Sequence, residues 1–151
     1  MAELKDQLRS DLTAAMKSRD GFTTAVLRMA VAAITNEEVA GASARELSSA
    51  EEQAVITRAV RQRRESAETY AGAGRAELAE KEQAEADLLA RYLPAALTDQ
   101  ELDAIVADQV AAVEGASMKQ MGMIIKAVNA VVKGRADGSV VAGKVRAALS
   151  A

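Results

Sequence analysis

Hydrophobic residues recur at helical spacing from the beginning of the chain. An apolar side chain every four residues marks one narrow face of a helix and predicts a helix over residues 2–19. This stripe consists of Leu4, Leu8, Leu12 and Met16. The next apolar stretch predicts a helix over residues 22–39 and is hydrophobic on nearly every side. A helix of that kind is surrounded by others, so we expect it at the centre of an N-terminal bundle.

Local start and stop signals delimit two further N-terminal helices. Ser49 and Glu52 have the spacing of a capping box, in which each side chain satisfies a backbone donor of the other residue. They predict a helix over residues 49–71. A fourth helix is predicted over residues 75–92 and ends before Pro94, because the residue preceding a proline is pushed out of helical geometry.

Three short amphipathic helices are predicted in the C-terminal part. Their start signals are Thr98 with Glu101, Ser117 with Gln120, and Asp137. The stripes that follow are Leu102, Ile105, Val106, Gln109 and Val113; Met121, Ile125, Val128 and Val132; and Val141, Val145 and Leu149. The sequence therefore predicts an all-α protein, with a four-helix bundle-like N-terminal domain over residues 1–94 and a three-helix domain over residues 95–151.

Composition narrows the chemistry that the chain can perform. Its 151 residues include no Cys and no His, so it has no thiolate nucleophile and lacks both the usual proton shuttle near neutral pH and the commonest metal ligand. It also has no P-loop and no strand-borne Gly-rich fingerprint. We therefore expect a non-catalytic protein without a metal or a cofactor.

The sequence shows neither a membrane-spanning stretch nor a signal peptide. The longest nearly uncharged stretch, residues 22–34, contains Arg28 and is too short to cross a bilayer. The N-terminal segment is amphipathic and charged, unlike a signal peptide. We expect a cytoplasmic protein that does not enter the membrane.

Charge is distributed unevenly along the chain. From Gly115 onward there are 6 basic residues against Asp137 alone, a net charge of about +5, whereas the preceding 114 residues hold 13 basic and 21 acidic residues. The basic residues of this segment are Lys119, Lys126, Lys133, Lys144, Arg135 and Arg146.

Two interpretations of these cations stay open at this point. Lys119, Lys126 and Lys133 recur every seven residues, which predicts a narrow stripe opposite the apolar face of one helix. Such a stripe can be an ordinary solvated face, or a surface that neutralises the phosphates of a polyanion. The near absence of acids favours the second interpretation, and the lack of aromatic residues in this segment disfavours stacking on single-stranded bases.

The turn within Val131–Val141, VVKGRADGSVV, has a complete local explanation. Gly134 stands where a helix commonly ends in left-handed geometry, and Asp137 stands where the next helix commonly begins. Capping alone accounts for the pattern, although the same turn would also hold Arg135 in place for a partner.

An arginine-rich stretch occurs in the third predicted helix. Arg63 falls on its apolar arc, whereas Arg58, Arg61 and Arg64 lie outside that arc. A lone buried cation is costly, so Arg63 is expected to pair with a carboxylate of the fourth helix. The two candidates are Glu82 and Glu85. Acid-base or metal chemistry by this carboxylate pair is the weaker alternative, because no further ligands cluster nearby.

Several blocks of the sequence resemble the GatB/YqeY family, in particular its stand-alone YqeY-like proteins. The resemblance extends over essentially the whole chain. The blocks are Leu27-Arg28-Met29, Arg61-Gln62-Arg63-Arg64, Glu80-Lys81-Glu82, Tyr92-Leu93-Pro94, Met121-Gly122 and Lys133-Gly134-Arg135-Ala136-Asp137-Gly138. Carried onto this chain, the resemblance singles out Gly122, Lys126, Lys133, Gly134, Arg135 and Asp137. On physical grounds we expect Lys126, Lys133 and Arg135 to contact phosphates and Gly122 to allow a close approach between helices. Gly134 and Asp137 are expected to form the turn.

In that family the C-terminal unit is similar to the tail domain of the B subunit of the tRNA-dependent amidotransferase, which is implied to grip tRNA near its elbow. The large catalytic domain of that subunit has no counterpart in this sequence. A label of carbon-nitrogen ligase with glutamine as amido donor would therefore be inherited by association. The resemblance implies a tRNA-binding accessory protein, whose partners would include an aminoacyl-tRNA-handling enzyme or amidotransferase subunits. The alternatives are a protein-interaction module that binds no nucleic acid, and an accessory subunit of an amidotransferase complex.

Overall fold

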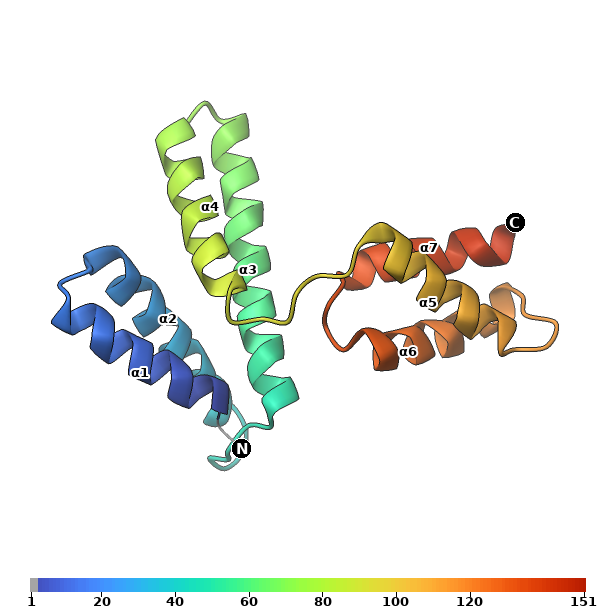
Figure 1. The fold of residues 1–151 in the computed structure, drawn as a ribbon, viewed down its shortest axis with the longest axis horizontal. Coiled ribbons are helices and arrows are strands. Elements are labelled where there is room, and N and C mark those ends of the chain that lie inside the picture. The colour runs from blue at the N-terminus through green and yellow to red at the C-terminus, as the bar shows by residue number, and fades with distance from the viewer. Residues whose placement is uncertain (1–2) are drawn as a thin grey trace. The chain divides into compact units, whose positions relative to one another are not determined.

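The computed structural model describes residues 3–151, and every regular element in that range is a helix (Figure 1). The chain divides into two compact units between Leu93 and Pro94. The N-terminal unit contains α1 (Glu3–Lys17), α2 (Gly21–Glu38), α3 (Ser49–Gly72) and α4 (Ala76–Ala90). The C-terminal unit contains α5 (Asp99–Ala111), the 3-10 helix η1 (Met118–Gln120), α6 (Met121–Val132) and α7 (Gly138–Ser150). The predicted all-α fold is confirmed; Ala2, the expected start of the first helix, lies outside the described residues.

The N-terminal unit consists of two helical hairpins, α1 with α2 and α3 with α4 (Figure 1). They share one hydrophobic core, to which every helix contributes. Side chains with 0% exposure in this core are Leu8, Leu27, Ile34, Ile56, Ala86 and Leu89. The Tyr92 hydroxyl beyond α4 donates a 2.6 Å hydrogen bond to Asp11 Oδ2 on α1, which ties the last residues of the unit to its first helix.

The expectation that the second helix is enclosed on all sides is wrong in part. α2 contacts α1, α3 and α4, as a central helix should. Its outer side nevertheless stays open, because Arg28 is exposed and Met29 is 58% exposed. In a unit of four helices, α2 therefore keeps one free side. The buried face of α2 consists of Val26, Leu27, Ala30 and Ile34.

The capping box at the start of α3 lies one residue earlier than the sequence indicated. Ser48 Oγ accepts from the Glu51 N–H at 3.2 Å, and Glu51 Oε2 accepts from the Ser48 N–H at 2.8 Å. Arg45 Nη2 lies 2.8 Å from Glu51 Oε1. The hydrogen bonds from Arg45 and from the Ser48 backbone lower the pKa of Glu51 to about 2. Two consecutive serines and two consecutive glutamates permit either register. In the observed register Glu51 takes part in the cap, and Glu52 lies on the buried face of α3.

Arg63 and Glu85 form an ion pair between α3 and α4. Arg63 Nε lies 3.3 Å from Glu85 Oε2, and the two side chains are only 11% and 14% exposed. Arg63 also donates from Nη1 to the Ala59 carbonyl at 3.3 Å. Glu82, the other candidate partner, makes no hydrogen bond or ion pair within residues 3–151. Of the two carboxylates that the sequence singled out, only Glu85 contacts the arginine.

Candidate nucleic-acid interface

The basic residues of the C-terminal segment stand on a compact three-helix unit. α5, α6 and α7 all contact one another around an apolar core. The buried members of this core are Leu102, Val106, Ile124, Val128, Val132, Val141 and Val145. Sequence periodicity identified most of these positions but missed Ile124, which is 0% exposed.

The three lysines spaced by seven residues do not form one continuous helical stripe. Only Lys126 lies within α6, on the side opposite Ile124 and Val128. Lys119 belongs to the 3-10 helix η1, and Lys133 adopts the left-handed conformation that ends α6. The regular spacing therefore does not place all three lysines on one α-helix, because the α-helical segment is shorter than the pattern suggested.

The turn between α6 and α7 contains two successive left-handed residues. Gly134 has a φ of 79°, as capping predicted, and Lys133 has a φ of 51°. A lysine in this region is strained, whereas glycine is not. Asp137 Oδ1 then accepts from the Ser139 N–H at 2.8 Å. Asp137 is thus the N-cap of α7, which begins at Gly138.

One glycine does not have the role expected for it. Gly122 is exposed, and a Cβ built on it would meet nothing within 4 Å. The expected close approach of a neighbouring helix at Gly122 is therefore wrong. Gly138 likewise has open space around it, and its φ is not positive. Only Gly134 among the family-motif glycines has a conformation that favours glycine.

Arg135 is half-buried and anchored to the segment that leads into α5. Its Nε donates to the Ala95 carbonyl at 3.0 Å, and its own carbonyl accepts from the Leu97 N–H at 2.9 Å. The outer guanidinium nitrogens make no such bond in the described structure. Sequence reasoning made this side chain a phosphate contact and missed its structural role, for which no local pattern gives a signal.

Lys144 on α7 is paired with carboxylates of α5. Its Nζ lies 2.7 Å from Asp103 Oδ1 and 3.6 Å from Asp99 Oδ1. The hydrogen bond to Asp103 is the main cause of a raised Lys144 pKa. The two aspartates share one face of α5 through their four-residue spacing, but the sequence does not show which helix that face meets. Lys144 therefore joins α7 to α5, and its charge is already paired with carboxylates.

Four of the six basic residues remain available to a ligand. Lys119, Lys126, Lys133 and Arg146 are all exposed, and their side chains have no ion pair or hydrogen bond in the part of the chain that the structure describes. They come from η1, α6, the turn after α6, and α7. With no acidic side chain paired to them, these cations can neutralise phosphates.

The same unit also exposes large apolar side chains. Met118, Met123, Val131 and Val140 are between 45% and 56% exposed. Single exposed apolar residues are common on protein surfaces, but these four occur within one short stretch of the chain. They are the observation that favours a protein partner.

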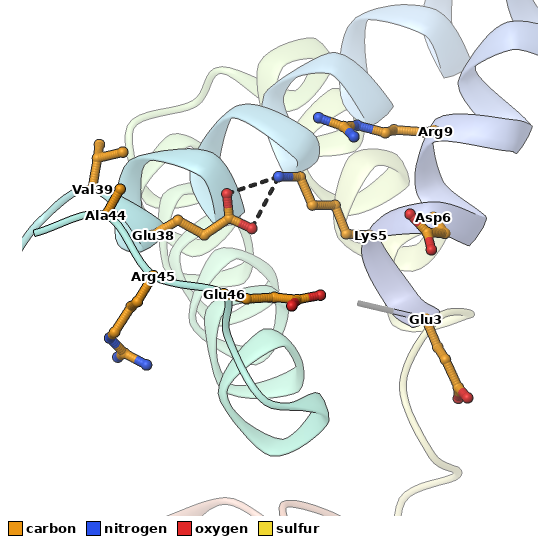
Figure 2. A pocket seen from close by; sticks show the side chains of 9 residues that line it. All are labelled: Glu3, Lys5, Asp6, Arg9, Glu38, Val39, Ala44, Arg45 and Glu46. Atoms are coloured by element: carbon orange, nitrogen blue, oxygen red, sulfur yellow. Dashed lines mark hydrogen bonds and ion pairs between the residues drawn. The ribbon is translucent and has the colours of Figure 1, made fainter. Parts of the chain in front are cut away.

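A second candidate location is an open depression in the N-terminal unit, with a volume of about 720 Å³ (Figure 2). It lies among the first turns of α1, the end of α2 and the loop that follows. Its lining mixes both signs of charge and consists of Glu3, Lys5, Asp6, Arg9, Glu38, Val39, Ala44, Arg45 and Glu46. Among residues 3–151, no three acidic side chains come together in a way that could hold a metal ion.

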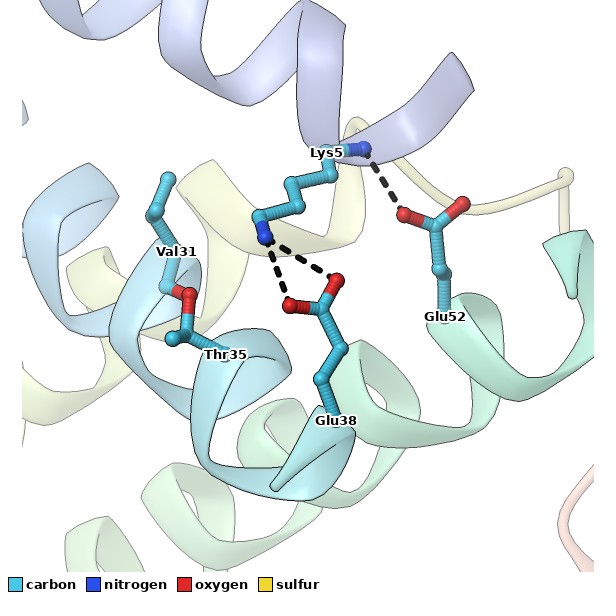
Figure 3. A network of polar contacts seen from close by, with 5 residues as sticks. All are labelled: Lys5, Val31, Thr35, Glu38 and Glu52. Carbon is cyan, nitrogen blue, oxygen red and sulfur yellow. Dashed lines mark hydrogen bonds and ion pairs between the residues drawn. The ribbon is translucent and has the colours of Figure 1, made fainter. Parts of the chain in front are cut away.

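Beside this depression, Lys5 joins α1 to both α2 and α3 (Figure 3). Its Nζ donates to the two Glu38 carboxylate oxygens at 2.9 and 2.8 Å, and its backbone N–H donates to Glu52 Oε2 at 3.2 Å. Glu52 is 1% exposed, and its Oε1 has no hydrogen-bond partner. Burial is the largest influence on this carboxyl and raises its pKa. The arrangement fixes the first helix, and sequence reasoning missed it.

Comparison with known proteins identifies the family. The model of the family described as Yqey-like protein matches residues 5–149, so the chain belongs to that family. No curated protein matches the sequence. None of the described helices has both the length and the apolar character needed to cross a membrane.

Proposed function

We propose that this Yqey-like protein is a non-catalytic RNA-binding accessory protein and that its C-terminal unit binds the phosphate backbone of structured RNA. Its ligand is tRNA, contacted at the elbow. The observation that supports this most strongly is the set of four exposed, unpaired cations, Lys119, Lys126, Lys133 and Arg146. Their segment contains only one acid, Asp137, whose carboxylate caps α7.

The composition of the unit favours recognition through backbone and shape. All three aromatic residues of the chain, Phe22, Tyr70 and Tyr92, precede Pro94. Binding of single-stranded RNA commonly uses aromatic platforms on which bases stack. Structured RNA is instead recognised through its shape, its phosphates and its 2′-hydroxyls. A helical unit with exposed, unpaired cations and without aromatic side chains suits that second mode.

The resemblance of this unit to the tail of the amidotransferase B subunit supports tRNA as the specific ligand. On this proposal the protein acts in tRNA-dependent amidation or in the handling of aminoacyl-tRNA. Any chemistry is performed by a partner enzyme, and this chain contributes RNA binding.

The second candidate function is a protein-interaction module, and the exposed apolar residues favour it. Methionine and valine side chains on η1, α6 and α7 would form the contact with another subunit. A pull-down that survives high salt and nuclease treatment would support this candidate over RNA binding. If the partner is an amidotransferase complex, glutamine-dependent amidation should depend on this chain only when the other subunits are supplied.

A titration of the full chain against total tRNA at two salt concentrations tests the primary proposal. Binding through phosphate neutralisation releases counterions, so affinity should fall steeply between about 50 and 200 mM salt. The proposal predicts a shifted tRNA band at the lower concentration and a much weaker one at the higher. Absence of binding at the lower concentration would overturn it.

A further inference from the structure

The outer face of α3 carries arginines that the structure leaves without partners. Arg58, Arg61 and Arg64 are exposed, and none makes a hydrogen bond or an ion pair with another described residue. Arg63, within the same stretch, turns inward to Glu85. Fold stability therefore explains one of the four arginines and leaves three unexplained.

The spacing places these three arginines along one side of the helix. Each lies three residues after the previous one, so successive side chains rise about 4.5 Å along the helix and turn by roughly 60°. Neighbouring like charges on a helix cost a few tenths of a kcal/mol per pair. The arginines lie in the middle of α3, far from the C-terminal end where a cation would be favoured by the helix dipole.

Nearby acids do not neutralise this face. Residues 53–64 contain four arginines and no acid. Glu65 and Glu68 follow Arg61 and Arg64 at a spacing that permits ion pairs, yet no such pair forms. The three guanidinium groups are thus free of ion pairs within a chain segment that is acidic overall.

We infer that Arg58, Arg61 and Arg64 form a second phosphate-binding surface, which contacts the backbone of the same class of structured RNA; this inference rests on the proposed function. The planar guanidinium presents paired donors that match phosphate oxygens. The observations favour RNA over an acidic protein. Protein interfaces rely on large apolar or aromatic anchors, and α3 has no large hydrophobic residue among those exposed within residues 3–151. A phosphate backbone requires no such anchor.

The test compares three triple variants of the full chain. The first changes Arg58, Arg61 and Arg64 to Gln. The second, Lys119→Gln with Lys126→Gln and Lys133→Asn, removes the C-terminal cations. The matched control changes Lys17, Lys81 and Arg91 to Gln, three exposed cations of the N-terminal unit whose side chains have no partner among the described residues. All replaced side chains are exposed, so thermal unfolding midpoints should stay close to that of the unaltered chain.

The measured quantity is the dependence of tRNA affinity on salt. Each lost phosphate contact should reduce the slope of log K against log salt by about 0.9, so the α3 variant should lose about 2 to 3 from that slope. Over a fourfold rise in salt, the unaltered chain should then lose about 40-fold more affinity than the α3 variant. The control should keep the slope of the unaltered chain.

The outcomes separate this inference from the proposed function. An unchanged slope in the α3 variant, with a reduced slope in the C-terminal variant, would overturn the inference and leave the proposed function standing. A reduced slope in the α3 variant alone would support the inference and remove the C-terminal cations from the function. An equal reduction in the control would show that net charge alone is responsible and overturn the inference. A complete lack of tRNA binding by the unaltered chain would overturn both.

Discussion

Arg135 donates a hydrogen bond from Nε to the carbonyl oxygen of Ala95 at 3.0 Å. The Arg135 carbonyl in turn accepts from the Leu97 N–H, so one residue fastens the turn after α6 to the segment before α5. A variant at Arg135 would consequently alter the fold of the C-terminal unit as well as its charge. The RNA-binding proposal is better tested at Lys119, Lys126 and Lys133, whose side chains make no contact of this kind.

Replacing Arg135 should loosen this connection. We expect Arg135→Gln to lower the free energy of unfolding of the C-terminal unit by about 1 to 2 kcal/mol, because a charge-assisted hydrogen bond is lost and the Ala95 carbonyl loses its donor. Hydrogen exchange at the Leu97 amide should accelerate accordingly. Lys126→Gln is the control, since its exposed side chain has no partner and its replacement should change stability by less than about 0.5 kcal/mol. Unchanged protection of Leu97 in Arg135→Gln would contradict the anchoring role.

Lys133 offers a variant in which stability and binding change in opposite directions. Lys133→Gly removes a side chain from a left-handed backbone position and should raise the free energy of unfolding by about 1 kcal/mol. It also removes an exposed cation, so tRNA binding should weaken. Denaturant unfolding and a tRNA titration measure the two effects. Lys133→Arg keeps both the charge and the strain and should resemble the unaltered chain; stronger tRNA binding by Lys133→Gly would contradict the account.

The Arg63 and Glu85 pair predicts a difference between two similar substitutions on α4. Glu85→Gln leaves Arg63 largely buried without its anion and should destabilise the N-terminal unit by about 2 kcal/mol. Glu82→Gln is the matched control, because Glu82 has no partner in the described structure, and it should cost less than about 0.5 kcal/mol. Unfolding by urea measures both. Equal effects of the two substitutions would argue against a stabilising pair.

Glu52 predicts a pH dependence of stability in the N-terminal unit. Burial raises its pKa, so the folded protein holds this proton more tightly than the unfolded chain does. Ionising the buried Glu52 carboxyl lowers the free energy of unfolding. This loss is absent below the unfolded pKa of about 4.3 and complete once the pH exceeds the raised folded pKa. Stability of the unaltered chain relative to Glu52→Gln should therefore increase as the pH falls from about 7 to about 4. Denaturant unfolding at both values measures this difference, and a constant difference would refute the burial argument.

The sequence predicted the fold well because its main signals are local. Four-residue apolar spacing, the capping residues Thr98 and Asp137, and the break before Pro94 each act within a few residues. Where two local signals were equally good, prediction failed. The adjacent serines and glutamates at the start of α3 allow two capping registers, and the local pattern does not show which glutamate caps the helix and which one, Glu52, is buried.

The candidate site was less predictable, because its details depend on contacts between distant residues. Asp103 pairs with Lys144 across 41 positions, and Ala95 accepts from Arg135 across 40. Spacing along the sequence does not predict such contacts. The seven-residue spacing of Lys119, Lys126 and Lys133 suggested a helical stripe, but the helix covers only the middle one. The exposure of these lysines was predictable, whereas their arrangement was not.

The most direct test of the central claim is the salt dependence of tRNA binding by the full chain and by the variant with Lys119→Gln, Lys126→Gln and Lys133→Asn. Asn suits the left-handed position better than Gln does, so the last change removes charge without adding strain. If these lysines neutralise phosphates, the variant should bind more weakly at low salt, and its slope of log K against log salt should be smaller by about 2 to 3. Equal slopes and equal affinities for the two proteins would contradict the claim that these cations bind RNA.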